Sequence, residues 1–248
     1  MSDDTQDRYW EAMDLLDDDD ADAALEIAEE LLEDAPDDVD FLELRGLALS
    51  QLGDYEEALE TFEKIVAKDA EDIDGLARVI ETVIELGRLG EAEKRIDKLV
   101  ALAPAFGLAL QLRGTVRDIA GKTEEADADF DKAAELDEEL GPPAPRLSAA
   151  AFQRLFDERV ADLDDEHQAA VARCQIIHSA FPALEAVHDP GSHVSMSSPL
   201  WLDSEGEQPR LFVYRRNIER VALDEAELGD AIEDTLLEVL ATVLEGDE

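Results

Sequence analysis

The sequence predicts a mainly α-helical protein, an array of four helical hairpins followed by a small α+β region. Similar residue types recur every 34 positions through the first 140 residues. A proline-rich stretch at 141–146 interrupts this pattern, and short β-branched runs appear beyond it. A period of 34 is typical of stacked helical hairpins, because one hairpin cannot bury its own apolar stripe.

Small residues mark the 34-residue period. We expect the recurring alanines, with Gly46 and Gly114, to let the two helices of a hairpin approach closely. The recurring glycines are expected to end the first helix, since glycine adopts the left-handed conformation easily. Pro36 and Pro104 are expected to begin the following helix. The recurring residues are Ala24, Ala58, Ala92 and Ala126, then Gly53, Gly87 and Gly121, with Phe62 and Phe130 two periods apart.

The second hairpin shows the pattern most clearly, and the first shows it least. In the first hairpin the acidic run Asp17–Asp20 stands where the others have a glycine turn. In the second, apolar residues at helical spacing form one stripe before Gly53-Asp54 and another after it. The stripes are Phe41, Leu42, Leu44, Leu47, Ala48 and Leu52, then Tyr55, Ala58, Leu59, Phe62, Ile65 and Val66.

These residues resemble the tetratricopeptide repeat family. The best match is the second copy, with Leu42, Gly46, Gly53, Tyr55, Ala58 and Phe62. The resemblance divides the first part of the chain into repeats at 5–38, 39–72, 73–106 and 107–140. It implies a right-handed superhelix whose concave face, formed by the first helix of each repeat, binds a protein or peptide.

The resemblance also implies which residues line the concave face. No lysine or arginine cluster occurs among them, so the basic clamp that holds a peptide carboxylate in one branch of the family is absent. We therefore expect a partner with apolar or basic segments; the alternative is that these residues are merely solvated. The expected lining residues are Glu43, Leu47, Gln51, Ala77, Glu81, Ile84, Gln111, Thr115 and Asp118.

The chain is strongly acidic, with 65 acidic and 21 basic residues and a net charge of -44. Such a surface repels phosphate backbones and anionic lipid, so we expect neither nucleic-acid nor membrane binding. A basic partner, a high-salt cytoplasm and solubility alone are alternative explanations; the even spread of charge favours adaptation to solvent. No signal peptide or spanning segment is recognised, and Cys174 is the single cysteine, which together predict a cytoplasmic protein.

Beyond the 141–146 linker, residues 147–248 predict helices around short strands. We expect a helix over 147–173, a strand at Gln175–Phe181, a loop at 189–199 and a strand at Arg210–Arg215. A final helix is expected from Glu225 to Leu244, begun by a capping box of Asp224 and Glu227. The expected apolar faces of the two helices are Phe152, Leu155, Phe156, Val160 and Leu163, then Leu228, Ile232, Leu236, Val239, Leu240 and Val243.

This order of elements resembles a family of small bacterial zincin-like metallopeptidase domains, with the stretch 210–220 as the matching strand and following segment. The family places its H-E-x-x-H motif on the last helix, where this chain has Leu237, Glu238 and Ala241. Leu237 and Ala241 replace the two zinc-binding histidines, so Glu238 keeps only the position of the general base. Asp247, near a third ligand position, cannot substitute for both histidines. The resemblance therefore implies an inactive domain without metal or cofactor.

Histidines elsewhere offer an alternative metal site, although their spacing does not favour one. His178, His188 and His193 fall within 16 residues, with His167 earlier and Cys174 four residues before His178. The sequence thus leaves two hypotheses. The first is a non-catalytic interaction protein that binds a partner through its repeats; the second is a metallopeptidase that uses an unconventional metal site.

Overall fold

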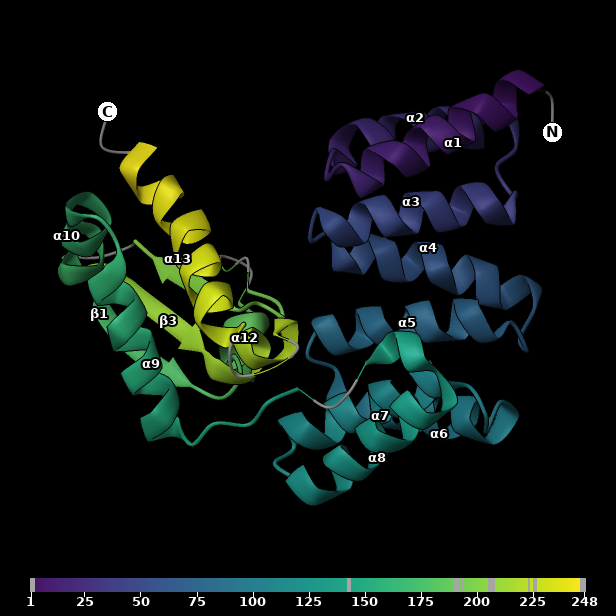
Figure 1. The fold of residues 1–248 in the computed structure, drawn as a ribbon. Coiled ribbons are helices and arrows are strands. Elements are labelled where there is room, and N and C mark those ends of the chain that lie inside the picture. The colour runs from purple at the N-terminus through teal and green to yellow at the C-terminus, as the bar shows by residue number, and fades with distance from the viewer. Residues whose placement is uncertain are drawn as a thin grey trace. The chain divides into compact units, whose positions relative to one another are not determined.

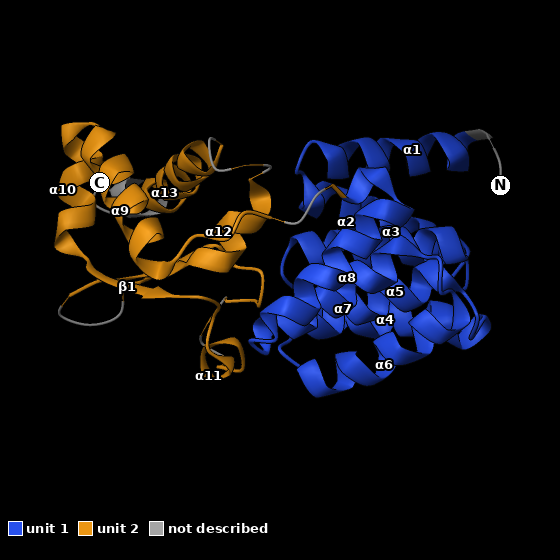
Figure 2. Cartoon of the chain, turned by 60° about the horizontal axis from the view of Figure 1, so that its bottom comes forward, with its two compact units in different colours: residues 1–140 blue, residues 141–248 orange. Residues whose placement is uncertain are grey.

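The chain divides into two compact units, residues 1–140 and residues 141–248 (Figure 2). A computed structural model describes residues 3–141, 144–189, 192, 194–204, 208–222, 224 and 227–245. The predictions that concern Pro142-Pro143, Pro190-Gly191, His193, Glu225 and Asp247 fall on residues outside these ranges. None of the described helices has the length and apolar character needed to cross a bilayer.

Unit 1 is a stack of helical hairpins, each packed against the next along the chain (Figure 1). First helices also contact each other directly, α1 with α3 and α5 with α7. The first helices are α1 (Asp3–Asp17), α3 (Val39–Gln51), α5 (Ile73–Glu85) and α7 (Gly107–Ile119); the second helices are α2 (Ala21–Asp34), α4 (Tyr55–Lys68), α6 (Leu89–Leu102) and α8 (Thr123–Leu136).

The expected close approach within each hairpin is confirmed. The four recurring alanines are fully buried. A Cβ atom added at Gly46 would collide with the Phe62 ring, and one at Gly114 would lie 2.7 Å from the Phe130 ring. The glycine therefore supplies the space that the phenylalanine fills, and changing either residue alone would leave a clash or a cavity.

All four hairpin turns share one hydrogen-bonded geometry. The N–H that follows the left-handed residue of each turn donates to the carbonyl five residues back, as in Asp54 to Leu49 at 2.9 Å and Asp20 to Leu15 at 2.8 Å. The left-handed residue is a glycine in three copies: Gly53, Gly87 and Gly121 have φ of 81°, 66° and 74°. In the first repeat Asp19 occupies this place with φ of 61°. The acidic turn therefore keeps the repeat geometry at a steric cost.

The prolines do not begin helices, so this part of the prediction is wrong. Pro36 follows Ala35, the residue that caps the end of α2, and α3 begins only at Val39. Pro104 stands in the same relation to Ala103 and to Gly107, the start of α7. A proline here stops the preceding helix from continuing, because it lacks the N–H that another helical turn would need.

Unit 2 contains a three-stranded sheet with strand order β1-β3-β2 and several helices. β3 runs parallel to β1, with Ile176 opposite Leu211, and antiparallel to β2, with Leu202 opposite Leu211. The elements are α9 (Ala149–Asp162), α10 (Asp165–Arg173), β1 (Gln175–Ser179), α11 (Leu184–Val187), β2 (Leu200–Asp203), β3 (Arg210–Tyr214), α12 (Arg215–Val221) and α13 (Leu228–Glu245).

The core of unit 2 joins one face of the sheet to the expected apolar faces of α9 and α13. Leu211 and Val213 point into this core from β3 and are fully buried with Phe156, Leu236 and Leu240. The expected helix over 147–173 is instead two helices, because Leu163 leaves the helical conformation and Asp164 caps α10.

Element ends also differ from those predicted in unit 2. β1 ends at Ser179, and Arg215 begins α12 rather than ending β3. The last helix starts at Leu228. The predicted cap is nevertheless present in part, since the Glu227 N–H donates to Asp224 Oδ1 at 3.1 Å.

A buried ion cluster on α12, which the sequence did not predict, fastens the end of the linker to unit 2. Arg216 and Glu219 pair with each other and are 3% and 0% exposed. Arg216 Nη1 donates to the Pro145 carbonyl at 3.0 Å, and the Leu147 N–H donates to Glu219 Oε1 at 3.0 Å. These bonds satisfy charges that would otherwise be costly to bury.

Asn217, also on α12, orders a second irregular segment. Its side-chain amide donates to the Met196 and Ser198 carbonyls at 2.8 Å each, which holds the loop before β2. Backbone groups of irregular segments need such partners once they are buried. One short helix therefore fixes both the chain entering unit 2 and the loop that leads to its edge strand.

Replacing Asp19 by glycine should stabilise the protein, because glycine adopts φ of 61° without the steric penalty paid by aspartate. We expect the free energy of unfolding to rise by about 0.5–1 kcal/mol. Urea unfolding followed by circular dichroism measures it. The matched control is Asp18→Gly, which removes the same charge from a residue of negative φ and should lower stability. Equal effects of the two variants would contradict this account of the turn.

Candidate functional site

The candidate site is the first-helix face, defined here as the surface of Glu43, Leu47, Gln51, Glu81, Gln111 and Thr115 on α3, α5 and α7, together with Tyr9 of α1 and Arg78 of α5. Glu43, Leu47, Glu81, Gln111 and Thr115 are half-buried on these helices and keep surface available for contact. The structure buries three other expected lining residues: Ala77, Ile84 and Asp118 are 2%, 4% and 4% exposed and offer little side-chain surface.

Gln51, the last of the expected lining residues, is exposed, and its side chain makes a hydrogen bond within the stack. Its side-chain amide donates to the Leu16 carbonyl at 3.1 Å, near the end of α1. That carbonyl belongs to the last turn of a helix, where carbonyl groups lack intrahelical partners. Gln51 therefore links the second repeat to the first.

Arg78, which the sequence did not single out, links two of the expected lining residues. Its Nε lies 3.9 Å from Glu43 Oε1, and its Nη1 lies 3.2 Å from Glu81 Oε2. The first contact joins α5 to α3, while the second is an i,i+3 pair within α5. The side chains remain about one-third to two-fifths exposed. One guanidinium thus serves two carboxylates on neighbouring repeats.

The two carboxylates are poorly neutralised despite Arg78. Burial raises the pKa of Glu81, and Arg78 opposes this through its charge and hydrogen bond while Glu85 adds to it. Burial also raises the pKa of Glu43, where Arg78 again opposes and Asp74, Asp72 and Asp40 reinforce the shift. A raised carboxyl pKa means that the surroundings disfavour the negative form, so an added positive charge would be stabilised here.

Tyr9 continues the same environment onto α1. Burial raises the pKa of its phenol, with further contributions from the negative charges of Asp40, Glu43 and Asp38. Its ring centroid lies 6.3 Å from that of Phe41 on α3. The first-helix face thus combines an aromatic ring with surrounding carboxylates at its N-terminal end.

The arginines of α7 pair with a carboxylate of α8, the second helix of their own hairpin, instead of adding positive charge to the first-helix face. Arg113 Nη2 and Arg117 Nη1 both lie 2.6 Å from Asp129 of α8, a carboxylate that is 4% exposed. Arg45 of α3 similarly reaches Glu57 of α4 at 3.2 Å. These guanidinium groups are committed to holding hairpins together, which leaves the first-helix face predominantly negative.

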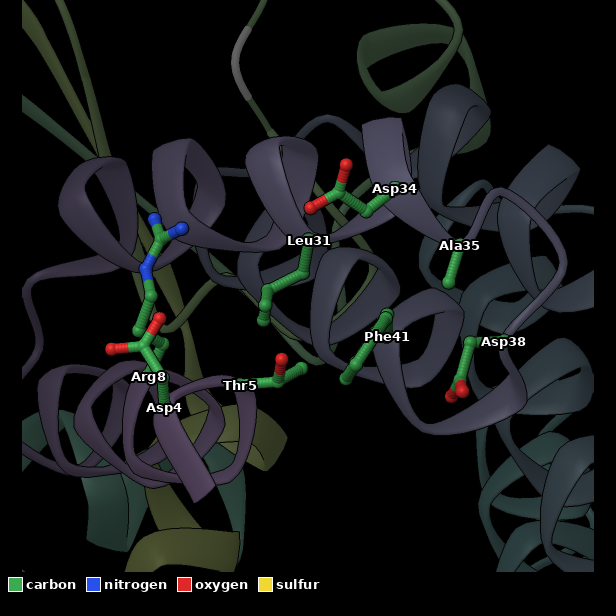
Figure 3. A pocket seen from close by; sticks show the side chains of 8 residues that line it. All are labelled: Asp4, Thr5, Arg8, Leu31, Asp34, Ala35, Asp38 and Phe41. Atoms are coloured by element: carbon green, nitrogen blue, oxygen red, sulfur yellow. The ribbon is translucent and has the colours of Figure 1, made fainter. Parts of the chain in front are cut away.

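A hollow of about 290 Å³ lies where α1, α2 and α3 meet (Figure 3). Leu31 and Phe41 give it an apolar part, and Arg8 on its wall pairs with Glu30 outside it. Carboxylates of α1, of α2 and of Asp38, which caps the start of α3, line it, so its chemistry suits a cation on an aliphatic stem. The lining residues are Asp4, Thr5, Arg8, Leu31, Asp34, Ala35, Asp38 and Phe41.

The residues at the expected H-E-x-x-H positions lie on α13, one helical turn apart. Leu237 is half-buried and packs against the core of unit 2, whereas Glu238 and Ala241 are exposed. Neither a leucine nor an alanine side chain can bind a metal. Within the described residues there is no group of three histidine, cysteine or acidic side chains arranged to hold a metal ion.

The described histidines lie in separate surroundings. His167 Nδ1 is 2.8 Å from Asp164 Oδ1 at the start of α10, and the His167 N–H and ring lower the pKa of that carboxyl. The His178 ring packs edge-on against Phe156 with centroids 5.1 Å apart, and burial lowers its pKa although Asp157 opposes the shift. His188 caps the end of α11.

Comparison with known families identifies the repeats. Residues 9–73 and residues 49–114 each match a tetratricopeptide repeat model. Tetratricopeptide repeats are therefore present in unit 1, as the sequence predicted. Both matches end by residue 114, so they give no support to the zincin-like resemblance of residues 147–248. A comparison with curated proteins finds no match.

A solved structure shares the fold of the repeats. A thermophilic tetratricopeptide repeat protein of Thermus thermophilus, TTC0263, is 22% identical with a TM-score of 0.51; the match covers 68% of this chain and 90% of that one. MamA from Desulfovibrio magneticus RS-1 is 24% identical with a TM-score of 0.48, over 69% of this chain and 92% of that one. At this identity the first likeness shows the fold alone.

The raised pKa of Glu81 predicts a specific dependence of stability on pH. The native state holds its proton more tightly than the unfolded state, so this carboxyl favours folding below its ordinary pKa of 4.5. That contribution is lost as pH rises through the raised native pKa. Glu81→Gln should therefore gain stability relative to the parent chain above this window, measured by urea unfolding between about pH 4 and pH 8.

Glu60→Gln is the matched control, since it removes one charge from an exposed position on α4. A Glu81→Gln protein that is less stable than this control near neutral pH would show that the ion pair with Arg78 outweighs the cost of burial.

Proposed function

We propose that this protein is a non-catalytic interaction protein whose first-helix face binds a partner segment carrying basic and apolar side chains. The tetratricopeptide resemblance implies protein or peptide binding on this face. The expected contact residues remain Glu43, Leu47, Gln51, Glu81, Gln111 and Thr115, with Tyr9 and Arg78 added to them. Ala77, Ile84 and Asp118 would support the face from beneath.

The observation that carries the proposal is the sharing of Arg78 between Glu43 and Glu81. Half-buried carboxylates with raised pKa values gain when a cation approaches, because the surroundings already disfavour their negative charge. Leu47 and the Tyr9 ring supply apolar contact beside them. The hollow between α1, α2 and α3 offers the same combination of carboxylates and apolar surface for one basic side chain.

The test compares three peptides of about 15 residues by fluorescence anisotropy: one of alternating lysine and leucine, one with lysine replaced by glutamate, and one with leucine replaced by serine. Only the first should bind well. Glu43→Gln combined with Glu81→Gln should weaken its binding about tenfold, since close charge pairs contribute strongly at such sites.

Glu33→Gln combined with Glu60→Gln is the control, because it removes two charges from exposed positions on second helices. Equal weakening by both double variants would mean that the peptide senses only the overall charge of -44, and the proposed site would be wrong.

For residues 147–248 we propose a zincin-like domain that has lost its metal site. The order of strand, short helix and terminal helix after Arg210 and the one-turn spacing of Leu237 and Ala241 support this interpretation. The alternative, a metallopeptidase with an unconventional metal site, has no candidate ligand cluster among the described side chains.

Leu237→His with Ala241→His should create a zinc site, because imidazoles one helical turn apart can share one ion. Calorimetric titration with zinc measures the affinity. The control is Glu60→His with Lys64→His, the same spacing on the exposed face of α4. In a zincin-like domain the remnant of the peptidase cleft would surround α13. The histidine pair at 237 and 241 should therefore bind zinc about tenfold more tightly than the pair on α4. Equal affinities would contradict the zincin-like assignment.

A further inference from the structure

The outward face of α1 departs from the pattern of α3 and α7. α3 has a strip of three residues that the preceding repeat covers, and α7 has an equally placed buried strip; in α5 the middle position is Arg78, whose side chain is 39% exposed. In α3 this strip is Phe41, Leu44 and Ala48, all at most 2% exposed and all in one core cluster with residues of α1 and α2. In α7 the equivalent residues, 68 positions later, are Ala109, Leu112 and Val116, at most 7% exposed.

The equivalent strip of α1, 34 positions earlier than that of α3, is Asp7, Trp10 and Asp14. The two aspartates are exposed, as the outer face of a terminal repeat requires for solubility. Trp10 does not follow this pattern of polar residues. It occupies the repeat position equivalent to Leu44, and it is 55% exposed, against 1% for Leu44. Its ring is held edge-on by Tyr9 with centroids 5.2 Å apart. Among the described elements of unit 1, α1 packs against α2 and α3, and it forms one end of the stack (Figure 1).

We infer that the strip of Asp7, Trp10 and Asp14 docks an amphipathic helix with basic flanks, contributed by a partner protein as an added layer of the stack. The helix would repeat at the end of the array the packing that already joins the hairpins. Trp10 would then fill the role of Leu44, with far more apolar area to bury.

Charge selects the occupant. Asp7, Glu11 and Asp14 surround Trp10 on the exposed side of α1, and no described cation pairs with any of them. A second copy of this chain would bring the same carboxylates against themselves, which is unfavourable for a protein of net charge -44. A helix with lysine or arginine on both sides of its apolar stripe avoids this repulsion. This surface differs from the first-helix face, so either proposal can fail alone.

The sequence of α6 supplies a probe, because α6, the second helix of the third hairpin, packs against α7 in the stack. The probe is a labelled, end-capped peptide of residues 89–102 with Glu91→Gln, Glu93→Gln and Asp97→Asn, which keeps Lys94, Arg95 and Lys98. The unchanged α6 peptide is the comparison. Fluorescence anisotropy with the full chain should show tighter binding of the basic peptide.

Trp10→Gln should weaken binding of the basic peptide about tenfold, as is usual for a tryptophan at the centre of an interface. The matched control is Leu102→Gln, which changes another exposed apolar residue, 42% exposed at the end of α6, and should leave binding unchanged. Circular dichroism confirms that both variants fold.

Three results would overturn the inference. The first is absence of binding, or equal weakening by the two variants. The second is a dimer in light scattering that Trp10→Gln dissociates, which would assign the strip to a second copy. The third is that acrylamide fails to quench the fluorescence of Trp10 in a Trp201→Phe chain, which would mean that another part of the same chain covers the strip. Ready quenching of Trp10 there, with a monomer in solution, is the expected result.

Discussion

The stack of unit 1 depends on a steric match between the two helices of each hairpin. Where the first helix has Gly46 or Gly114, the second presents the ring of Phe62 or Phe130. In the third repeat the equivalent positions are Ile80 and Ile96, both nearly fully buried. In the first they are Ala12 and Ala28. The pair is one small and one large residue in the second and fourth hairpins, two residues of intermediate size in the third, and two small residues in the first. Each hairpin therefore fills its interior with a different combination of side-chain sizes.

Arginine holds this acidic stack together. Arg45 reaches carboxylates on both α2 and α4, and Arg95 of α6 joins Glu63 of α4 at 2.7 Å. The planar fork of the guanidinium allows one side chain to serve two carboxylates, which an ammonium does less well. With 21 basic residues against 65 acidic ones, such shared pairs are an economical way to limit repulsion between repeats. They also leave the first-helix face without surplus positive charge, which is why we propose a basic partner for it.

The sequence by itself determined what depends on local pattern. The period of 34 identified the hairpins, and the glycines at 53, 87 and 121 identified the turns, because a left-handed residue leaves few alternatives to glycine. Alternating residues located β3, and the capping pattern at Asp224 placed the start of the last helix close to its observed start at Leu228. The place of Pro36 was misjudged because proline is compatible with both the end of one helix and the start of the next.

Only the tertiary structure decided which of the expected lining residues are accessible and how they are charged. Ile84 and Asp118 have the spacing of the first-helix face, yet neighbouring helices bury them. Arg78 became part of the site because stacking brings α5 beside α3, where it meets Glu43. The same stacking distinguishes Trp10 from Leu44, which occupy equivalent positions in sequence but differ in whether a repeat lies over them. Burial and charge pairing arise between repeats, and no pattern within one repeat contains that information.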